Sequence, residues 1–136
     1  MIAERFMGCR GVVQLLDAFC GSVPNKCWCL VYDFHGISLA DVLHEGPLPV
    51  KAVRDVFLDV LTGIECVHKA GFLHADVKPP NILVRKGGHE PGGSGWSAVV
   101  GDLGTAVKVF GKGLSAERIF ASTVWVFWCV HRLSFR

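Results

Sequence analysis

Three side chains that could take part in group transfer lie close together in one short stretch of the chain. Asp76, Lys78 and Asn81 fall within six residues, in a segment that contains two prolines. A carboxylate can accept a proton, an ammonium can neutralise an anion, and an amide oxygen can bind a hard cation. A second carboxylate, Asp102, lies between two glycines, which let the backbone turn sharply near a ligand. Because oxygen donors from Asn81 and Asp102 suit Mg²⁺, the set predicts a site for phosphoryl transfer.

One amphipathic helix and several short strands are expected to position these groups. Residues 50–70 carry apolar side chains at helical spacing, and Gly71 follows as a C-terminal cap. The stripe expected to face the core consists of Val53, Val56, Phe57, Val60, Leu61, Ile64 and His68. A Ser-x-x-Asp pattern beginning at Ser38 predicts a shorter helix that runs to about His44. Apolar runs between turn residues predict strands, of which the first two form a hairpin, at 12–19, 27–34, 82–84, 97–100 and 105–109.

Two motifs in this order are similar to those of a known enzyme family. The sequence of residues 74–84, HADVKPPNILV, resembles the H-R-D-L-K-x-x-N catalytic loop of eukaryotic protein kinases. The sequence of residues 101–104, GDLG, resembles the D-F-G element of that family, with leucine in place of phenylalanine. The resemblance covers roughly residues 10–110 and is most similar to serine/threonine kinases of the cyclin-dependent type.

The resemblance implies an α+β fold that is part of a protein kinase domain: the end of the small-lobe sheet, the hinge and the catalytic core of the helical large lobe. The domain would occupy residues 1–125, followed by a divergent C-terminal tail. The expected parts are a small-lobe remnant at 1–34, a hinge at 33–37, a large-lobe core at 38–125 and the tail at 126–136.

The resemblance also implies a role for each polar residue of the two motifs, with ATP and Mg²⁺ as cofactors. Asp76 would act as the catalytic base or orient the substrate hydroxyl, and Lys78 would steady the transferring phosphate. Asn81 and Asp102 would hold Mg²⁺. A lysine two residues after the catalytic aspartate is similar to serine/threonine kinases. His74 is expected to pack and to form hydrogen bonds within the loop.

The segment that would contact adenine precedes the first helix. The sequence LVYDFH at residues 30–35 resembles the last small-lobe strand as it enters the hinge. By that resemblance Tyr32 is the gatekeeper, and backbone groups of Asp33 and His35 bond to the adenine. Leu83 would pack beneath the purine.

Several features depart from the family pattern. Ala75 replaces the arginine that pairs with a phosphorylated activation loop, and 26 positions separate Asp76 from Asp102, more than the family leads us to expect. We find no Gly-rich phosphate loop or strand lysine upstream. The sequence ASTVW at 121–125 resembles the segment before the A-P-E element, after which the resemblance stops. We therefore expect an incomplete sequence, from a retained intron, a frameshift or a truncated gene model, and weak or absent nucleotide binding.

Two kinds of function are compatible with this pattern. The first is a serine/threonine protein kinase fragment that transfers the γ-phosphate of ATP to a protein hydroxyl once the remaining parts of the lobes are present. The alternative is a catalytically inactive kinase-like fragment that binds another protein over the helix at 50–70, or a non-functional truncated product. Ser115, Ser122 and Thr123 lie in the expected activation segment and could be phosphorylated, but any exposed hydroxyl could be.

The length fits one modest domain, and the charged share is below that of an average soluble domain. The chain has 136 residues, of which 51% are hydrophobic and 19% charged, and a formal net charge of +2. This balance does not favour nucleic acid or acidic membranes as partners. The apolar run at 120–130 is eleven residues long, shorter than the roughly twenty that a membrane-spanning helix needs. We therefore expect neither a nucleic-acid partner nor a membrane segment.

The six cysteines are expected to be free thiols in a reducing compartment, since no secretory signal stands at the N-terminus. This predicts an intracellular protein, cytoplasmic or nuclear. Cys27 and Cys29 form a C-x-C pair rather than the C-x-x-C spacing of a zinc chelate. We expect them to be two buried strand thiols.

Overall fold

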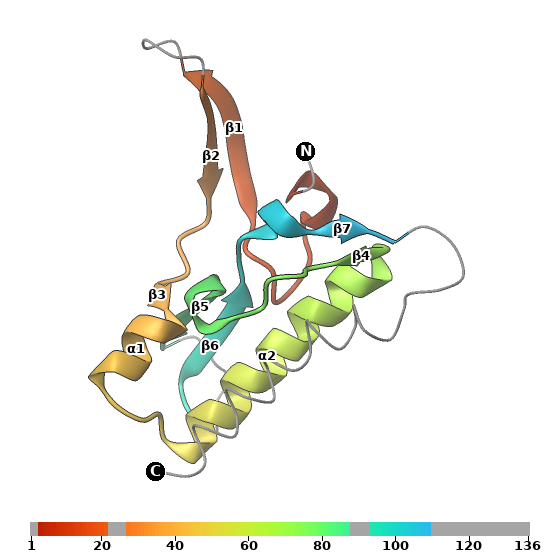
Figure 1. Ribbon diagram of the computed structural model, residues 1–136. Coiled ribbons are helices and arrows are strands. Elements are labelled where there is room, and N and C mark those ends of the chain that lie inside the picture. Colours follow the sequence, from red (N-terminus) through yellow and green to blue (C-terminus); the bar gives the residue numbers. More distant parts are fainter. Residues whose placement is uncertain (1–2, 22–26, 88–92, 110–136) are drawn as a thin grey trace.

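Two α-helices and three small antiparallel sheets make up the described part of the computed structural model of the chain (Figure 1). It describes residues 3–21, 27–87 and 93–109, and its mixture of helices and strands confirms the expected α+β class. The elements in chain order are η1 (Ala3–Phe6), β1 (Leu15–Gly21), β2 (Cys27–Tyr32), β3 (Ile37–Ser38), α1 (Leu39–Glu45), α2 (Val50–Lys69), β4 (Phe72–Leu73), η2 (Pro79–Asn81), β5 (Ile82–Lys86), β6 (Trp96–Val100), η3 (Leu103–Thr105) and β7 (Val107–Lys108).

Both predicted helices are confirmed, together with the signals that start and end them. The Ser38 hydroxyl caps α1 by accepting a hydrogen bond from the Asp41 amide at 3.1 Å, as its Ser-x-x-Asp pattern predicts. Helix α2 ends where Gly71 adopts a left-handed conformation with φ of 80°. The Gly71 amide donates to the carbonyl of His68 at 2.9 Å, which satisfies one of the last carbonyls of the helix.

The strands form three separate sheets, each with antiparallel pairing. Strands β1 and β2 form a hairpin that projects away from the rest of the molecule (Figure 1). A three-stranded sheet has the order β3-β5-β6, and β4 pairs with β7. The residues expected to form a strand at 105–109 instead divide between η3 and the two-residue β7.

The first expected strand begins later than its apolar run. Val12 and Val13 leave the hairpin and join the end of β6: Val12 forms a parallel bridge with Val100, and the Val13 amide donates to the Val100 carbonyl at 2.9 Å. Strand β1 therefore begins at Leu15. An apolar run alone does not distinguish these two kinds of pairing.

The main hydrophobic core lies between α2 and the sheet that contains β5 and β6. The residues of α2 that are buried are Ala52, Val56, Val60, Gly63 and Val67. The expected stripe was partly wrong: Leu61 is 43% exposed and His68 is exposed, whereas Ala52, Gly63 and Val67, which it omitted, are buried. Ala52 and Gly63 face the sheet because their small size lets the helix approach it closely. A prediction based on the spacing of large apolar side chains does not detect such positions.

Two carboxylates of α2 hold the start of β6 against the helix. Asp55 Oδ2 accepts a hydrogen bond from the Ser94 amide at 2.7 Å, and Asp59 Oδ2 accepts one from the Ala98 amide at 3.0 Å. The Gly87 amide also donates to the carbonyl of Gly95. These bonds fix both ends of the connection between β5 and β6.

A second core joins η1 to the C-terminal end of α2. It contains Phe6, Val12, Val67, Phe72, Leu103 and Ala106. The rings of Phe6 and Phe72 meet edge to face with centroids 5.6 Å apart. This core brings the N-terminal turn of the chain, the end of α2 and η3 together.

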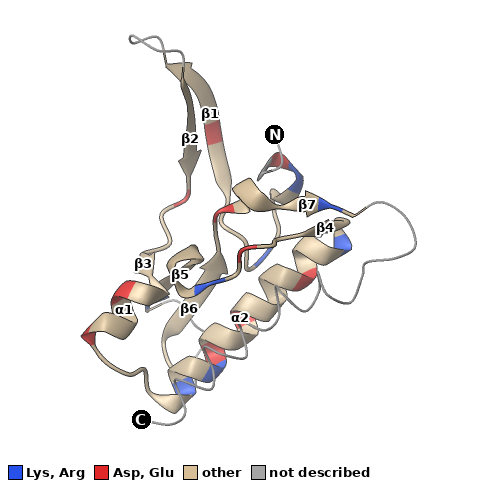
Figure 2. Ribbon diagram, in the orientation of Figure 1, with Lys and Arg blue, Asp and Glu red and all other residues tan. Residues whose placement is uncertain are grey.

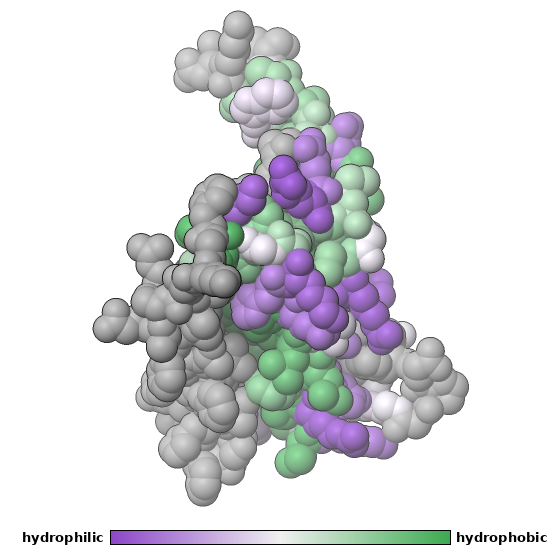
Figure 3. Space-filling view, turned by 90° about the vertical axis from the view of Figure 1, so that its right-hand side faces the viewer, coloured by the Kyte–Doolittle hydropathy of each residue, from purple (hydrophilic) through white to green (hydrophobic). Residues whose placement is uncertain are grey.

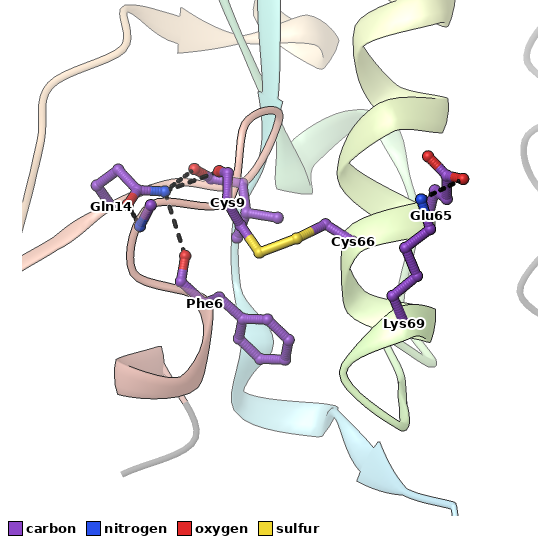
Figure 4. The surroundings of a disulfide bond; sticks show 8 residues. Phe6, Cys9, Gln14, Glu65, Cys66 and Lys69 are labelled. Carbon is purple, nitrogen blue, oxygen red and sulfur yellow. Dashed lines mark hydrogen bonds and ion pairs between the residues drawn. A yellow bond between two sulfur atoms is a disulfide. The ribbon is translucent and has the colours of Figure 1, made fainter.

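A disulfide between Cys9 and Cys66 lies beside this core (Figure 4). The expectation that all six cysteines are free thiols is therefore wrong, because folding brings together two cysteines that are 57 positions apart. Cys27 is exposed and Cys29 partly exposed, so these two are not the buried strand thiols that we expected. They lie on the projecting hairpin, where no core covers them.

Charges of both signs are interspersed along α2 (Figure 2), and a hydrophobic area bordered by hydrophilic residues lies at the height of this helix on one face of the molecule (Figure 3). Large apolar side chains of α2 are exposed at Val50, Leu58 and Leu61.

Within the part of the chain that the structure describes, no helix is both long and apolar enough to cross a membrane.

The contact between α2 and the segment before β1 is made by backbone atoms. A Cβ added to Gly63 would overlap the carbonyl oxygen of Gly11, and one added to Gly11 would lie 2.5 Å from the Gly63 nitrogen. Gly11 also has a φ of 79°, which side-chain-bearing residues rarely adopt.

We predict that Gly63→Ala destabilises the protein. Helix propensity alone would stabilise it by about 1 kcal/mol, but the clash requires the helix to shift, and overpacking of this kind costs about 1–3 kcal/mol. A net loss in the free energy of urea-induced unfolding is the expected result. Thr62→Ala, at the adjacent exposed position, is the control and should change stability by less than about 0.5 kcal/mol. Equal stability of Gly63→Ala and Thr62→Ala would contradict the backbone contact.

Candidate active site

Three segments that are far apart in the sequence converge on one region of the fold. The loop at 74–81 connects β4 to β5, and the turn at 101–104 follows β6. Because β5 and β6 are hydrogen-bonded neighbours, the end of the loop and the start of the turn meet: the Gly101 amide donates to the Asn81 carbonyl at 2.8 Å. The third segment, at 32–36, leads from β2 into β3, which pairs with β5.

His74 is the buried polar centre of this region, with 1% of its surface exposed. The Asp76 amide donates to its Nδ1 at 3.3 Å, so this nitrogen carries no proton. Its Nε2 therefore carries the proton and donates to the Gly101 carbonyl at 2.8 Å. The hydroxyl of Thr105 donates to the His74 carbonyl at 3.2 Å. The expected packing and hydrogen-bonding role of His74 matches this arrangement, in which a neutral imidazole links the loop to the turn.

Burial lowers the pKa of His74 from its ordinary value of 6.5, because a charged imidazole would lose its hydration there. The Gly101 hydrogen bond and the carboxylates of Asp76 and Asp102 oppose this effect only in part. Protonation of Nδ1 would also break the hydrogen bond from the Asp76 amide. The neutral form is therefore the one that the folded structure favours.

Asp76, Lys78 and Asn81 form a connected polar cluster. Lys78 Nζ lies 2.8 Å from Asp76 Oδ2, and the Asn81 side-chain amide donates to the same oxygen and to the Asp76 carbonyl, each at 2.9 Å. The hydrogen bond from Lys78 is the main cause that lowers the pKa of Asp76, and the Asn81 bond adds to it. Asp76 is therefore a carboxylate at neutral pH, held in place by two donors.

Asp102 occupies a left-handed turn directly after β6. Its φ is 53°, and its Oδ1 accepts a hydrogen bond from the Gly104 amide at 3.3 Å. Ala75 is the other described non-glycine residue with positive φ, at 65°. Such a conformation costs roughly 1–2 kcal/mol for an L-residue and is concentrated at functional sites. Both of these residues lie in the two motifs identified from the sequence.

A cavity of about 620 Å³ lies where the three segments meet. This volume falls within the range of sites for small molecules and cofactors. Residues assigned to nucleotide and metal binding line it together: Tyr32, Asp33, His35, Leu83, Asn81 and Asp102. Asp76 and Lys78 are not among its lining residues, but Asp76 is hydrogen-bonded to Asn81, which is.

Other lining residues were not identified from the sequence. They are Val13, Leu30, Phe34, Gly36, Pro80, Gly101, Leu103 and Gly104. Val13 reaches the cavity because its segment pairs with the end of β6, a long-range contact that leaves no local signal in the sequence. The hydrogen bond from Thr105 to His74 was missed for the same reason.

His35 is held at the cavity by its side chain as well. Its Nε2 lies 3.4 Å from the hydroxyl of Ser97 on β6. Burial is the largest cause that lowers the pKa of His35, and the nearby Arg85 adds to it. The serines and threonine of the expected activation segment, and the sequence at 121–125, lie outside the described residues.

Comparison with known proteins places these features in a wider context. The family model described as "Protein kinase domain" matches residues 2–126. The chain is 35% identical over 117 residues to a sporulation protein kinase of Schizosaccharomyces pombe, and 31% identical over 124 residues to a serine/threonine-protein kinase of Emericella nidulans. It is also 31% identical over 117 residues to a probable cyclin-dependent serine/threonine-protein kinase of Dictyostelium discoideum.

These matches cover most of this chain but only a small part of each relative. They span 84%, 84% and 86% of this chain, in the order given, and 20%, 26% and 16% of the relatives. The chain therefore spans about a quarter or less of the length of these curated relatives.

We predict that part of the stability of the protein depends on His74 remaining neutral. Because the pKa of His74 is lowered by folding, the unfolded chain binds more protons as the pH falls below about 7, and the free energy of unfolding decreases. The decrease continues until the pH passes the lowered pKa of the folded state. One such proton contributes at most about 1.4 kcal/mol per pH unit.

The measurement is urea-induced unfolding of the wild type and His74→Gln at several pH values between about 5 and 8. The variant should lose part of the pH dependence, whatever its stability at neutral pH. His35→Gln provides a comparison, because burial also lowers the pKa of His35. An unchanged pH dependence in His74→Gln would show that the imidazole does not titrate as proposed.

Proposed function

The chain belongs to the protein kinase domain family, and on this premise we propose that it contributes the catalytic loop and metal-binding residues of a serine/threonine kinase site. The observation that carries the proposal is the meeting of three segments at one cavity, which brings Tyr32, Asn81 and Asp102 together. The proposed reaction transfers the γ-phosphate of ATP to a serine or threonine hydroxyl of a protein substrate. Since it consumes ATP, the proposal includes an intracellular location, cytoplasmic or nuclear.

The adenine would lie in the apolar part of the cavity, beside the segment that follows β2. The Asp33 amide donates to the Gln14 carbonyl at 2.9 Å, so we assign its carbonyl rather than its amide to the adenine. Backbone groups of His35 supply the second contact in this proposal. Leu83 and Tyr32, which line the same cavity, would provide the apolar surface beneath and behind the ring.

The donor atoms of Asn81 and Asp102 fit a magnesium ion. The Asn81 side-chain nitrogen already donates two hydrogen bonds toward Asp76, which leaves its amide oxygen as the atom to face a cation. Asp102 adds a carboxylate from the opposite segment of the cavity lining. Mg²⁺ prefers oxygen ligands and retains several waters, and when bound it would neutralise charge on the phosphates.

Asp76 and Lys78 are positioned for the transfer itself. The bonds from Lys78 and Asn81 hold the Asp76 carboxylate in one orientation and keep it ionised, as a group that accepts the substrate hydroxyl proton must be. Lys78 is 42% exposed at its side chain, so its ammonium can also reach a phosphate group in the solvent-facing part of the site.

The alternative is a catalytically inactive kinase-like chain that binds a protein partner over α2. The observation in its favour is the exposure of large apolar side chains on this helix, 88% for Val50, 49% for Leu58 and 43% for Leu61. Exposed apolar groups of this kind mark protein contacts when they are contiguous. This function would not require the magnesium ligands.

We predict weak, magnesium-dependent binding of ATP by the 136-residue chain. Asp102→Asn, which removes a charged ligand and keeps the size of the side chain, should weaken binding by about tenfold or more. Titration calorimetry with ATP, in the presence of Mg²⁺ and of EDTA, measures both effects. Asp17→Asn on β1, which does not line the cavity, is the control. Absence of binding, or binding that is indifferent to Mg²⁺ and to Asp102, would sink the nucleotide-site proposal.

We further predict that phosphate transfer depends on Asp76. Asp76→Asn keeps the size of the side chain but removes the carboxylate that accepts the proton. Loss of a general base lowers turnover by about 10²–10⁴. The assay follows labelled phosphate from ATP to serine- and threonine-containing peptides, with Asp17→Asn as the control. If the wild type binds Mg·ATP but transfers no phosphate, the inactive alternative is favoured over catalysis.

A further inference from the structure

We infer that Cys9 and Cys66 are a reversible redox pair that controls the order of the segment at 9–13 and, through it, the end of β6. In the disulfide state this segment is fastened to α2, and in the dithiol state only non-covalent contacts hold it. The inference goes beyond phosphoryl transfer. Its link to the active site rests on the proposed function, but the pair itself does not.

The two cysteines join parts of the chain that no continuous element connects. Cys9 lies in the turn after η1, and Cys66 lies in the last turns of α2 (Figure 4). Both are partly buried and pack against the core formed by η1, the end of α2, β4 and η3. The disulfide therefore fastens the N-terminal turn of the described chain to the end of its longest helix.

Two kinds of non-covalent contact join this segment to α2: Val12 is buried in the same core as Val67, and a backbone contact lies beside that core. Gly63, one turn before Cys66, meets Gly11 backbone to backbone, with no side chain from either residue between them. Such a contact contributes little unless the two backbones stay close together. A covalent link two residues from Gly11 provides that condition, because it restricts how far the segment can move.

Hydrogen bonds carry the constraint from this segment to the active site. The Gly11 carbonyl accepts from the Val100 amide at 2.8 Å, and the Val13 amide donates to the Val100 carbonyl at 2.9 Å. Val13 lines the cavity directly. Gly101 and Asp102 follow Val100 in the chain, so loosening of the segment removes two of the bonds that hold the start of the Asp102 turn.

Loop closure explains why the state of the pair matters. The two cysteines are 57 positions apart, and a cross-link over a loop of this size restricts the unfolded chain, by an amount that grows slowly with the length of the loop. In the dithiol state that restriction is absent, and the segment at 9–13 becomes the part of the core that opens most easily.

Of the two cysteines, Cys9 lines a hollow through which a small thiol compound can approach. This hollow of about 310 Å³ is lined also by Gly8, Arg10 and Gln14. Neither Cys9 nor Cys66 is fully buried.

The chemistry is two successive thiol–disulfide exchanges. The Cys9 thiolate attacks one sulfur of the small disulfide, forming a mixed disulfide and releasing the first small thiolate. The Cys66 thiolate then attacks the Cys9 sulfur and releases the second. The two protein thiols lose two electrons in total, the small disulfide gains them, and the two protons of the protein thiols end on the two released small thiols. Reduction by excess small thiol reverses both steps.

The test equilibrates the full 136-residue chain in mixtures of reduced and oxidised glutathione and identifies cross-linked peptides by mass spectrometry. Hydrogen exchange is then measured on peptides that contain Val13 and Val100, whose amides donate the bonds described above. This readout needs no nucleotide, so it is independent of whether the chain binds ATP.

We expect a peptide pair linked through Cys9 and Cys66 that appears and disappears with the glutathione ratio. Exchange at the two amides should be about tenfold faster, or more, in the reduced chain. Cys66→Ser and Cys9→Ser should each show the fast exchange under all conditions. Cys20→Ser, which alters an exposed free cysteine on β1, should respond like the wild type.

Two results would overturn the inference. One is absence of the Cys9–Cys66 peptide at every glutathione ratio. The other is equal exchange at Val13 and Val100 in the linked and reduced wild-type chain, a comparison that needs no variant and therefore holds even if a cysteine substitution prevents folding.

Discussion

Gly11 and Gly63 bring two backbones together where most packed elements are separated by side chains. On one side of this contact is α2, the longest element of the described chain, and on the other is the segment that precedes β1. Because the segment approaches so closely, its carbonyl and amide groups can pair with the end of β6. The position of Asp102, which follows β6, and of Val13, which lines the cavity, both depend on this approach.

A second set of contacts consists of hydrogen bonds and centres on the neutral imidazole of His74. One ring nitrogen accepts from the loop that carries Asp76, and the other donates to the turn that carries Asp102. The ring thus joins the backbone of the loop that carries Asp76 to the backbone of the turn that carries Asp102. Among the described residues, no buried side-chain nitrogen or oxygen lacks a hydrogen-bond partner. Ala75, with a φ of 65°, lies between His74 and Asp76 in this bonded loop.

The features that could be predicted from the sequence are those encoded by neighbouring residues. The Ser38 cap, the length of α2 and the polar residues of the two motifs all depend on short spacings, and the structure contains each of them. The features that were missed depend on which distant segments pack together. The bridge between Val12 and Val100 displaced the expected start of β1, and the approach of small residues changed the buried face of α2. The Cys9–Cys66 bond was missed because only the folded chain brings these two cysteines together.

The hydrogen bonds that Asp55 and Asp59 accept from the start of β6 have a consequence for how this sequence can vary. With the Gly87–Gly95 bond, they hold the two ends of the connection between β5 and β6 in place. The entropy cost of a longer flexible connection grows only slowly with its length. A longer connection at this place therefore leaves the two motifs together in space, since the Gly101 amide is bonded to the Asn81 carbonyl although 26 positions separate Asp76 from Asp102. The register of β5 against β6, rather than the number of residues between the motifs, sets the distance between them.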